Sequence, residues 1–263
     1  MTKSNDTPEK PLILVSNDDG ITAPGIGFLV EVMKEIGRVI VVAPNSPQSG
    51  MGHAITVGNS LRLDKVDMFD GVEAYECSGT PADCIKLAKH YVLKDEKPDL
   101  VVSGINHGAN TSVSVLYSGT MSAAIEAAIE GLPAIGFSLC DFKHDADFSH
   151  IIPLVKKIAS EALTSGIPQG VALNVNFPAI SEQPIKGIRV CRQANAHWQE
   201  NFDQREDPYG RKYFWLVGDF VNEDKGEDTD EWALSQNYAS IVPCQFDLTA
   251  HHALSKLNEW NLN

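Results

Sequence analysis

Residues 12–20 read LILVSNDDG, and the architecture of the chain follows from this segment. Leu12–Ser16 is an uncharged, mostly apolar run, and two adjacent carboxylates, Asp18 and Asp19, follow it closely. Such a run is typical of a strand in a parallel sheet that helices cover on both faces. Similar runs recur at residues 39–43, 74–77, 100–103, 134–138 and 171–176.

Segments with helical periodicity separate these runs, at about residues 27–35, 81–93, 121–129 and 148–164. Alternating strands and helices indicate a parallel sheet whose strands are joined by right-handed helical crossovers. The sequence therefore predicts an α/β fold in which helices flank the sheet.

The pattern changes at about residue 184, so we expect a flexible tail at 1–10, an α/β catalytic core at 11–184 and a β-rich extension at 185–263. Strand-like runs in the extension occupy residues 187–192, 212–217 and 240–248, with a charged loop at 223–231. No helical crossover separates them, which favours β-hairpins. Because an isolated two-stranded ribbon is marginal in water, apolar residues such as Trp215 must pack on the main sheet or on another subunit.

The composition restricts the partners. The chain has a formal net charge of −14 and no basic cluster, so we expect no polymeric nucleic acid partner. A phosphate ester would have to be attracted locally, by a cation or by backbone N–H groups. Five scattered cysteines without paired metal spacing are typical of reduced thiols. With no signal peptide and no apolar run of membrane-spanning length, we expect a cytoplasmic protein without membrane contact.

Unusual polar residues follow the predicted strands, at the edge where ligands bind in open parallel sheets. Asp18 and Asp19 repel each other unless a cation or donors compensate, and two carboxylate oxygens suit Mg²⁺, Mn²⁺ or a similar ion. An ordinary Asp-Gly turn with a capping Asp explains the pair equally well. After the second strand, Ser49 or Ser46 could add a neutral oxygen ligand, or the segment could be only an irregular loop.

The later strand ends have the same double interpretation. Thr80 and Asp83 form a good helix start. The amide oxygen of Asn106 could bind a metal, and His107 could transfer a proton or be merely solvated. Residues 117–120, Tyr-Ser-Gly-Thr, open a helix whose free N–H groups could hold a phosphate or simply be capped. Because four successive strand ends carry such residues, the set as a whole predicts a metal–phosphate site.

The motifs resemble those of the SurE (survival protein E) nucleotidase family. The resemblance is carried, in order from about residue 12 to 251, by the following segments: SNDDG at 16–20 with APGI at 23–26, AP at 43–44 with SG at 49–50, GTP at 79–81 with Asp83, SGIN at 103–106 with Gly108 and Asn110, YSGT at 117–120 with Ala123, Ala124 and Glu126, DPYG at 207–210, and DLTAH at 247–251.

This resemblance implies a Rossmann-like fold and hydrolysis of nucleoside 5′- and 3′-monophosphates, with short polyphosphate as a further substrate. One divalent cation per subunit would be held by Asp18, Asp19, Ser49 and Asn106. Asn17 would donate to the phosphate. The same resemblance implies exchange of the C-terminal arm between subunits, giving a homodimer or homotetramer.

The remaining expected catalytic residues, besides Asp18, Asp19 and Asn17, are Ser118, Gly119 and Thr120, which would stabilise charge on the phosphoryl oxygens. Residues 111–114, Thr-Ser-Val-Ser, depart from the family pattern, in which a glycine and acidic residues are common. The departure bears on substrate preference.

Two other classes use similar sheets. A Rossmann-like nucleotide-binding transferase or dehydrogenase would need a glycine-rich turn after the first strand, where this chain has Asp18 and Asp19. A receiver-like signalling module holds Mg²⁺ with paired acidic residues, but it needs an acceptor Asp after its third strand. Here that strand ends in Ser78-Gly79-Thr80.

Overall fold

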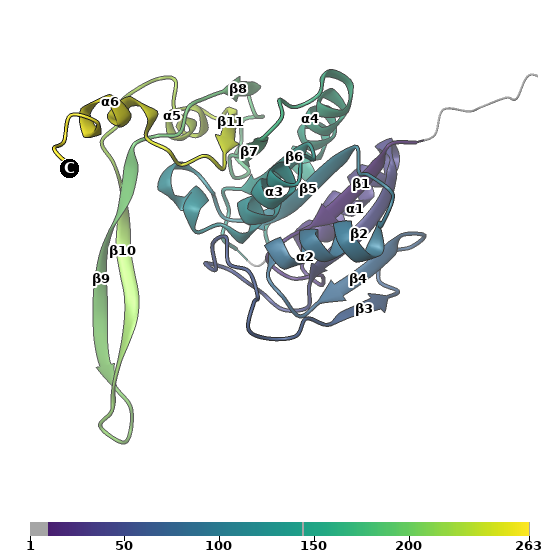
Figure 1. Cartoon of the computed structure of the whole chain (residues 1–263), viewed down its shortest axis with the longest axis horizontal. Coiled ribbons are helices and arrows are strands. Elements are labelled where there is room, and N and C mark those ends of the chain that lie inside the picture. The colour runs from purple at the N-terminus through teal and green to yellow at the C-terminus, as the bar shows by residue number, and fades with distance from the viewer. Residues whose placement is uncertain (1–9, 144, 263) are drawn as a thin grey trace, which may run out of the picture.

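A nine-stranded sheet runs through the body of the molecule in the computed structural model, which describes residues 10–143 and 145–262 (Figure 1). In sheet order its strands are β3 (Leu63–Val66), β4 (Glu73–Cys77), β2 (Arg38–Pro44), β1 (Leu12–Ser16), β5 (Leu100–His107), β6 (Ala134–Leu139), β7 (Val171–Phe177), β11 (Ala239–Gln245) and β8 (Ile188–Val190). The pairs from β4 to β7 are parallel, whereas β3 and β11 pair antiparallel with β4 and β7. The predicted α/β fold with a mainly parallel sheet is confirmed. Of the tail predicted for 1–10, all but Lys10 lies outside the described residues.

The helices between the strands are α1 (Pro24–Ile36), α2 (Pro81–Leu87), α3 (Gly119–Ile129) and α4 (Ile152–Ser165), followed by α5 (Asp230–Ser235) and α6 (Leu254–Leu257). Shorter turns are η1 (Ala88–Val92, a π-helix) and the 3₁₀ turns η2 (Ser112–Leu116), η3 (Ser149–Ile151) and η4 (His251–Ala253). The helix predicted for 81–93 is therefore α-helical only as far as Leu87. No helix among the described residues is long and apolar enough to cross a membrane.

Helices cover both faces of the sheet, which explains the unbroken apolar runs. On β1, Ile13 and Val15 face the cluster that includes residues of α1 and α4, and Leu12 and Leu14 face the cluster that includes residues of α2 and α3. All four side chains are buried. Because β1 is buried on both sides, its side chains are apolar or small, and the polar residues Asn17, Asp18 and Asp19 follow its end.

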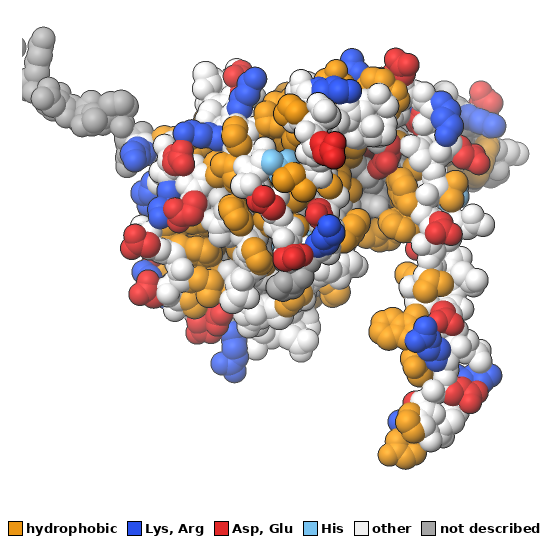
Figure 2. All heavy atoms as spheres, turned by 180° about the vertical axis from the view of Figure 1, so that it is seen from behind, with side chains coloured by type: hydrophobic (Ala, Val, Ile, Leu, Met, Phe, Trp, Pro, Cys, Tyr) orange, Lys and Arg blue, Asp and Glu red, His pale blue; other side chains and the backbone are white. Residues whose placement is uncertain are grey.

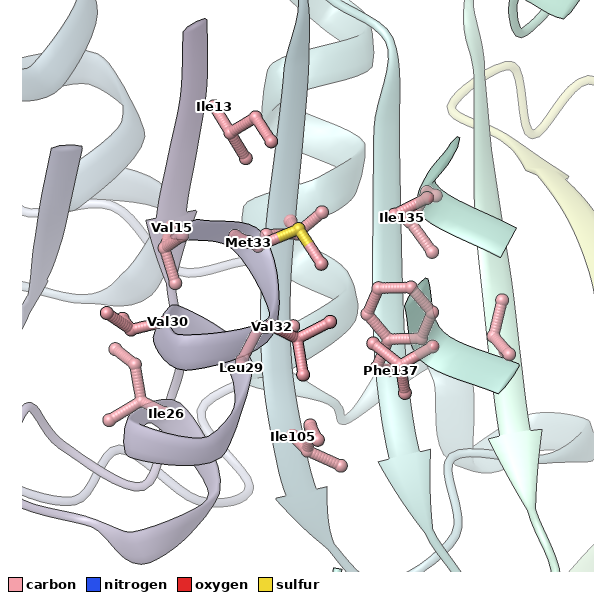
Figure 3. Close-up of a cluster of buried hydrophobic side chains, with 14 of the residues drawn as sticks. Ile13, Val15, Ile26, Leu29, Val30, Val32, Met33, Ile105, Ile135 and Phe137 are labelled. Atoms are coloured by element: carbon pink, nitrogen blue, oxygen red, sulfur yellow. The ribbon is translucent and has the colours of Figure 1, made fainter. Parts of the chain in front are cut away.

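The first of these clusters lies under α1. In Figure 3, Met33 of α1 lies over the strand that carries Ile105, and Phe137 comes from the next strand of the sheet. The start of α1 lies close to β5: a Cβ atom on Gly25 would be 2.0 Å from the carbonyl oxygen of Ile105. Only glycine permits this approach, which brings the loop after β1 against the end of β5.

The segment after residue 184 has two structural roles. β11 returns antiparallel to β7, and β8 pairs with β11, so both complete the main sheet. A separate two-stranded hairpin, β9 (Ala196–Glu206) and β10 (Lys212–Asn222), projects from the body as a long arm (Figures 1 and 2). The C-terminal β-hairpin expected from the sequence is thus present. The change of pattern near residue 184 marks the end of the long crossover helices, and the sheet continues beyond it.

Candidate active site

Asp18 lies at the end of β1, in contact with the start of α3. Its side chain accepts a hydrogen bond from the Thr120 hydroxyl and another from the Thr120 backbone N–H. A Cβ atom on Gly119 would lie 2.6 Å from the Cβ of Asp18, so only glycine permits this packing. The structure therefore brings together two motifs about a hundred residues apart in sequence.

Burial makes the negative charge of Asp18 costly. Asp18 is 4% exposed. This burial, together with the charge of Asp19, raises the pKa of Asp18 to about 6, although the hydrogen bonds from Thr120 act in the opposite direction. A carboxyl group with these surroundings becomes fully charged at neutral pH most easily when a cation lies beside it.

Asp19 contacts the end of β5. Its Oδ2 lies 3.1 Å from Nδ1 of His107 and 3.3 Å from the backbone N of the same residue. The imidazole packs edge-on against Phe148, with 5.0 Å between the ring centroids. Its Nε2 is buried and has no partner among the described residues. His107 is therefore held in place rather than freely solvated.

Asn106 lies beside this contact. The register between β5 and β6 shifts between Ser103 and Asn106, as in a β-bulge, which changes the direction of the following side chains. The Nδ2 of Asn106 donates to the carbonyl oxygens of His107 and Gly108 at 3.1 and 2.9 Å. With the amide nitrogen used in this way, the Oδ1 oxygen is the atom left for a ligand.

These residues fit a hard divalent cation. Asp18 and Asp19 supply carboxylate oxygens and Asn106 an amide oxygen, the ligand types that such ions prefer. Asn17 adds a buried Oδ1 atom without a partner among the described residues, while its Nδ2 donates to the Gly20 carbonyl at 2.8 Å. No group of three His, Cys, Asp or Glu side chains suited to a metal was found in the part of the chain that the structure describes. An ion here would therefore need neutral oxygens as well.

Ser49 lies in the loop after β2, which returns to the site. The backbone N–H of Gln48 donates to the carbonyl oxygen of Asp18 at 2.8 Å, and that of Gly52 donates to the Tyr117 carbonyl at 3.2 Å. Ser49, between these two contacts, is exposed. The loop thus passes from the end of β1 to the start of α3, the two elements that hold Asp18.

Two buried carboxylates hold the far end of this loop. Nε2 of His53 lies 2.8 Å from Glu126 on α3, which also accepts a 2.5 Å hydrogen bond from Lys86. Asp83 accepts from the backbone N–H and the hydroxyl of Thr56, at 3.0 and 2.7 Å. Burial raises the pKa of Glu126, but the hydrogen bonds from His53 and Lys86 outweigh it and hold the pKa below its usual value of 4.5.

Sequence reasoning treated Asp83 as part of a helix start and of a family motif, and gave it no contact with the loop after β2. The structure confirms a capping box between Thr80 and Asp83 and adds the contact with Thr56. Glu126 had no role, although a glutamate inside the apolar segment GTMSAAIEAAI was a usable signal. Ser118 caps α3, because its hydroxyl accepts from the N–H of Met121 at 3.0 Å.

A buried amide network supports the loop after β5. The backbone N–H of Asn110 donates to Oδ1 of Asn176, and its Nδ2 donates to the Ser138 hydroxyl, at 2.8 and 2.9 Å. Asn174 donates to the Asn110 carbonyl at 2.7 Å. Sequence reasoning missed Asn174 and Asn176, and their alternate positions in an otherwise apolar strand were the signal.

Comparison with known proteins gives similarities over nearly the whole chain. The family model described as "Survival protein SurE" matches residues 13–200. A protein from Cytophaga hutchinsonii named 5′-nucleotidase SurE is 69% identical over 252 residues, which are 95% of this chain and 97% of the relative. A protein of the same name from Bacteroides fragilis is 45% identical over 97% of this chain and 99% of its own length. The crystal structure of the SurE protein from Aquifex aeolicus matches with a TM-score of 0.81 and 38% identity, covering 94% of this chain and 98% of that one.

Proposed function

The chain belongs to the SurE family, and from this premise we propose that it is a metal-dependent nucleotidase. Its substrates would be nucleoside 5′- and 3′-monophosphates, which it would hydrolyse to nucleoside and phosphate. Each subunit would use one divalent cation, Mg²⁺, Mn²⁺ or similar. One structural observation supports the chemistry above all others. A buried carboxylate, Asp18, lies beside Asp19 and in contact with the N-terminus of α3. That arrangement suits a cation and an anionic phosphate next to each other.

Asp18 and Asp19 would hold the cation, with Oδ1 of Asn106 and the hydroxyl of Ser49 as neutral ligands. A bound divalent cation would supply positive charge to the phosphoryl group and lower the pKa of a nearby water molecule. The contacts of the Ser49 loop with Asp18 and Tyr117 support the inclusion of Ser49, because they join this loop to the elements that hold the carboxylates.

The phosphate would lie at the start of α3. The turn formed by Ser118, Gly119 and Thr120 presents the positive end of the helix dipole, which would stabilise charge on the equatorial oxygens of the phosphate. The Asn17 amide, oriented by its bond to Gly20, would donate its second N–H to the phosphate. His107, whose Nδ1 faces Asp19 and whose Nε2 is buried, would hold the Asp19 carboxylate in position beside the cation.

Phosphate release from 5′-AMP and 3′-AMP, measured with Mn²⁺, with Mg²⁺ and with a chelator, tests this function. We expect release with a divalent ion and none with the chelator, and most activity should be lost in Asp19→Asn. Asp70→Asn, at an exposed site away from these contacts, is the matched control. Phosphate release that persists in the presence of the chelator would refute the requirement for a divalent cation. Absence of phosphate release from both substrates would refute the nucleotidase activity. Short polyphosphate is a further substrate to assay.

We also propose a homodimer or homotetramer formed by exchange of the β9–β10 arm. Figure 2 shows hydrophobic side chains along the arm, and Phe202, Phe214 and Trp215 are each more than half exposed. A ribbon of this kind is stable only when a second surface covers it. Light scattering that gives a monomer of 28.6 kDa at micromolar concentration would contradict this proposal.

All five cysteines are free thiols, which supports a cytoplasmic location.

A further inference from the structure

A cavity of about 610 Å³ lies between the candidate active site and the base of the β9–β10 arm. Its lining residues are Gly50, Tyr117, Trp198, Glu200, Leu216, Val217 and Gly218. Two of them adjoin the catalytic segments, because Gly50 follows Ser49 and Tyr117 precedes Ser118. The lining of the cavity therefore includes residues directly next in the chain to those proposed for the cation and the phosphate.

We propose that this cavity, called the base pocket below, binds the nucleobase of the substrate between the side chains of Tyr117 and Trp198. The proposal rests on the nucleotidase function. The volume of the base pocket lies in the range of pockets that hold small organic ligands. Such pockets are mostly lined by apolar and aromatic side chains. Aromatic faces bind any of the bases by stacking, and Leu216 and Val217 add apolar contacts.

The charges fix the direction in which a nucleotide binds. The start of α3 presents a positive helix end, which favours the phosphate. Glu200, the charged member of the pocket lining, would repel a phosphate there. The uncharged base therefore goes to the pocket and the phosphate to α3.

Trp198 is held in a defined orientation. Its indole Nε1 donates to the Ser114 hydroxyl at 3.2 Å, and its ring packs against Phe220 with 5.4 Å between the ring centroids. Ser114 thus acts as a positioning residue for the pocket wall. It belongs to residues 111–114, the segment that is expected from the sequence to bear on substrate preference.

The rest of that segment supports the base of the arm. The Ser112 hydroxyl accepts from the backbone N–H of Ala196 at 3.1 Å and donates to the Ala194 carbonyl at 2.8 Å. Fully buried Asp230 accepts from the backbone N–H groups of both Ser112 and Ala194 at 2.9 Å. Trp198 is therefore two residues from a firmly attached point of the arm, so its side chain can form a stable wall.

Steady-state kinetics with two matched substrates tests the base pocket: AMP, and ribose 5-phosphate, which has the same phosphate ester and no base. Loss of one stacking partner should raise the KM for AMP about 5- to 150-fold in Trp198→Ala. The KM for ribose 5-phosphate should change less than about twofold. Tyr117→Ala, on the other wall, should show the same selectivity, and Ser114→Ala a smaller effect of the same kind.

Tyr91→Ala is the control, because this exposed aromatic residue lies outside both the arm and the pocket lining and should leave both KM values unchanged. Trp198→Phe keeps a stacking face and should retain most of the AMP selectivity, which guards against a variant that misfolds. Calorimetric binding of adenosine in the presence of chelator should be weaker in Trp198→Ala.

Equal effects of Trp198→Ala on AMP and ribose 5-phosphate, or no effect on either, would overturn the base pocket. So would a change of oligomer mass in Trp198→Ala with unchanged AMP kinetics, since the cavity would then serve a second copy of the chain. These results differ from failure of the nucleotidase function itself, in which the unaltered protein would hydrolyse neither substrate with Mn²⁺.

Discussion

Replacing Asp18 with asparagine should make the metal-free protein more stable at neutral pH while it removes the activity. The ionised side chain of Asp18 is buried beside Asp19, which raises its pKa from 3.8 to about 6. Asparagine has the same shape and no charge, and its amide oxygen can still accept from the Thr120 hydroxyl. The substitution therefore removes an electrostatic cost and keeps the packing.

The magnitude follows from the difference between the two pKa values. A rise of about two units corresponds to ~3 kcal/mol of lost stability once the group is ionised in both states. Because the folded-state pKa is raised, the unsubstituted protein has its full stability below pH 3.8 and loses this part as the pH rises through about 6. For a chain of this size, ~3 kcal/mol corresponds to about 6–12 °C in Tm.

Thermal unfolding in chelator at pH 4, 6 and 8 measures the effect. Asp18→Asn should match the unsubstituted protein at pH 4 and melt higher at pH 8, whereas Asp70→Asn should match it throughout. Added Mn²⁺ should raise the Tm of the unsubstituted protein, as any ligand of the folded state does, and raise that of Asp18→Asn far less. A gain in Tm that is equal at pH 4 and pH 8, or no gain at pH 8, would refute the reasoning.

Two further outcomes are expected. Gly119→Ala should lose most activity and bind Mn²⁺ more weakly, because the new Cβ would lie 2.6 Å from that of Asp18. Gly27→Ala is the control: no atom lies within 4 Å of its Cβ, so this variant should stay active and gain about 0.5–1 kcal/mol of helix stability. Equal kinetics for the two variants would contradict the close contact between Gly119 and Asp18. Glu126→Gln should cost about 1–3 kcal/mol at pH 7, because it weakens the hydrogen bond to His53 and removes the ion pair with Lys86. Since the pKa of Glu126 is lowered, urea unfolding should show this difference shrinking as the pH falls below 4.5, and a difference independent of pH would count against the ion pair.

The predictable part of the fold depends on local sequence. Leu12–Ser16 is recognisable as a buried strand because helices cover both of its faces, so every side chain is apolar or small. The carboxyl ends of parallel strands then have to meet at one edge of the sheet. That rule alone predicts that Asp19 and His107 lie near each other, as the 3.1 Å contact confirms. β3 was not predicted, since only a few of its residues are apolar and the strand lies at the edge of the sheet.

The unpredictable part depends on packing between distant segments. Thr120 and Asp18 are joined because Gly119 lets α3 approach β1, and no local pattern reveals which glycine has that role. The same holds for His53 and Glu126, which are 73 positions apart. A buried carboxylate in a helix requires hydrogen-bonding or charged partners, but the tertiary structure determines which residues they are.

The region after residue 184 shows how the same limit bears on function. Alternating residues in β11 are typical of a strand, but its pairing with β7 is non-local, so the sequence alone could not separate it from the projecting hairpin. The structure makes this separation and places residues 111–114 under the base of the arm, through Ser112 and Asp230. A substitution in this short segment, which follows the strand that carries Asn106, therefore acts on the arm and on the position of Trp198 as well. On this geometry, residues 111–114 bear on how the wall of the base pocket is held, through the contacts of Ser112 and Ser114, rather than on the groups proposed to bind the cation.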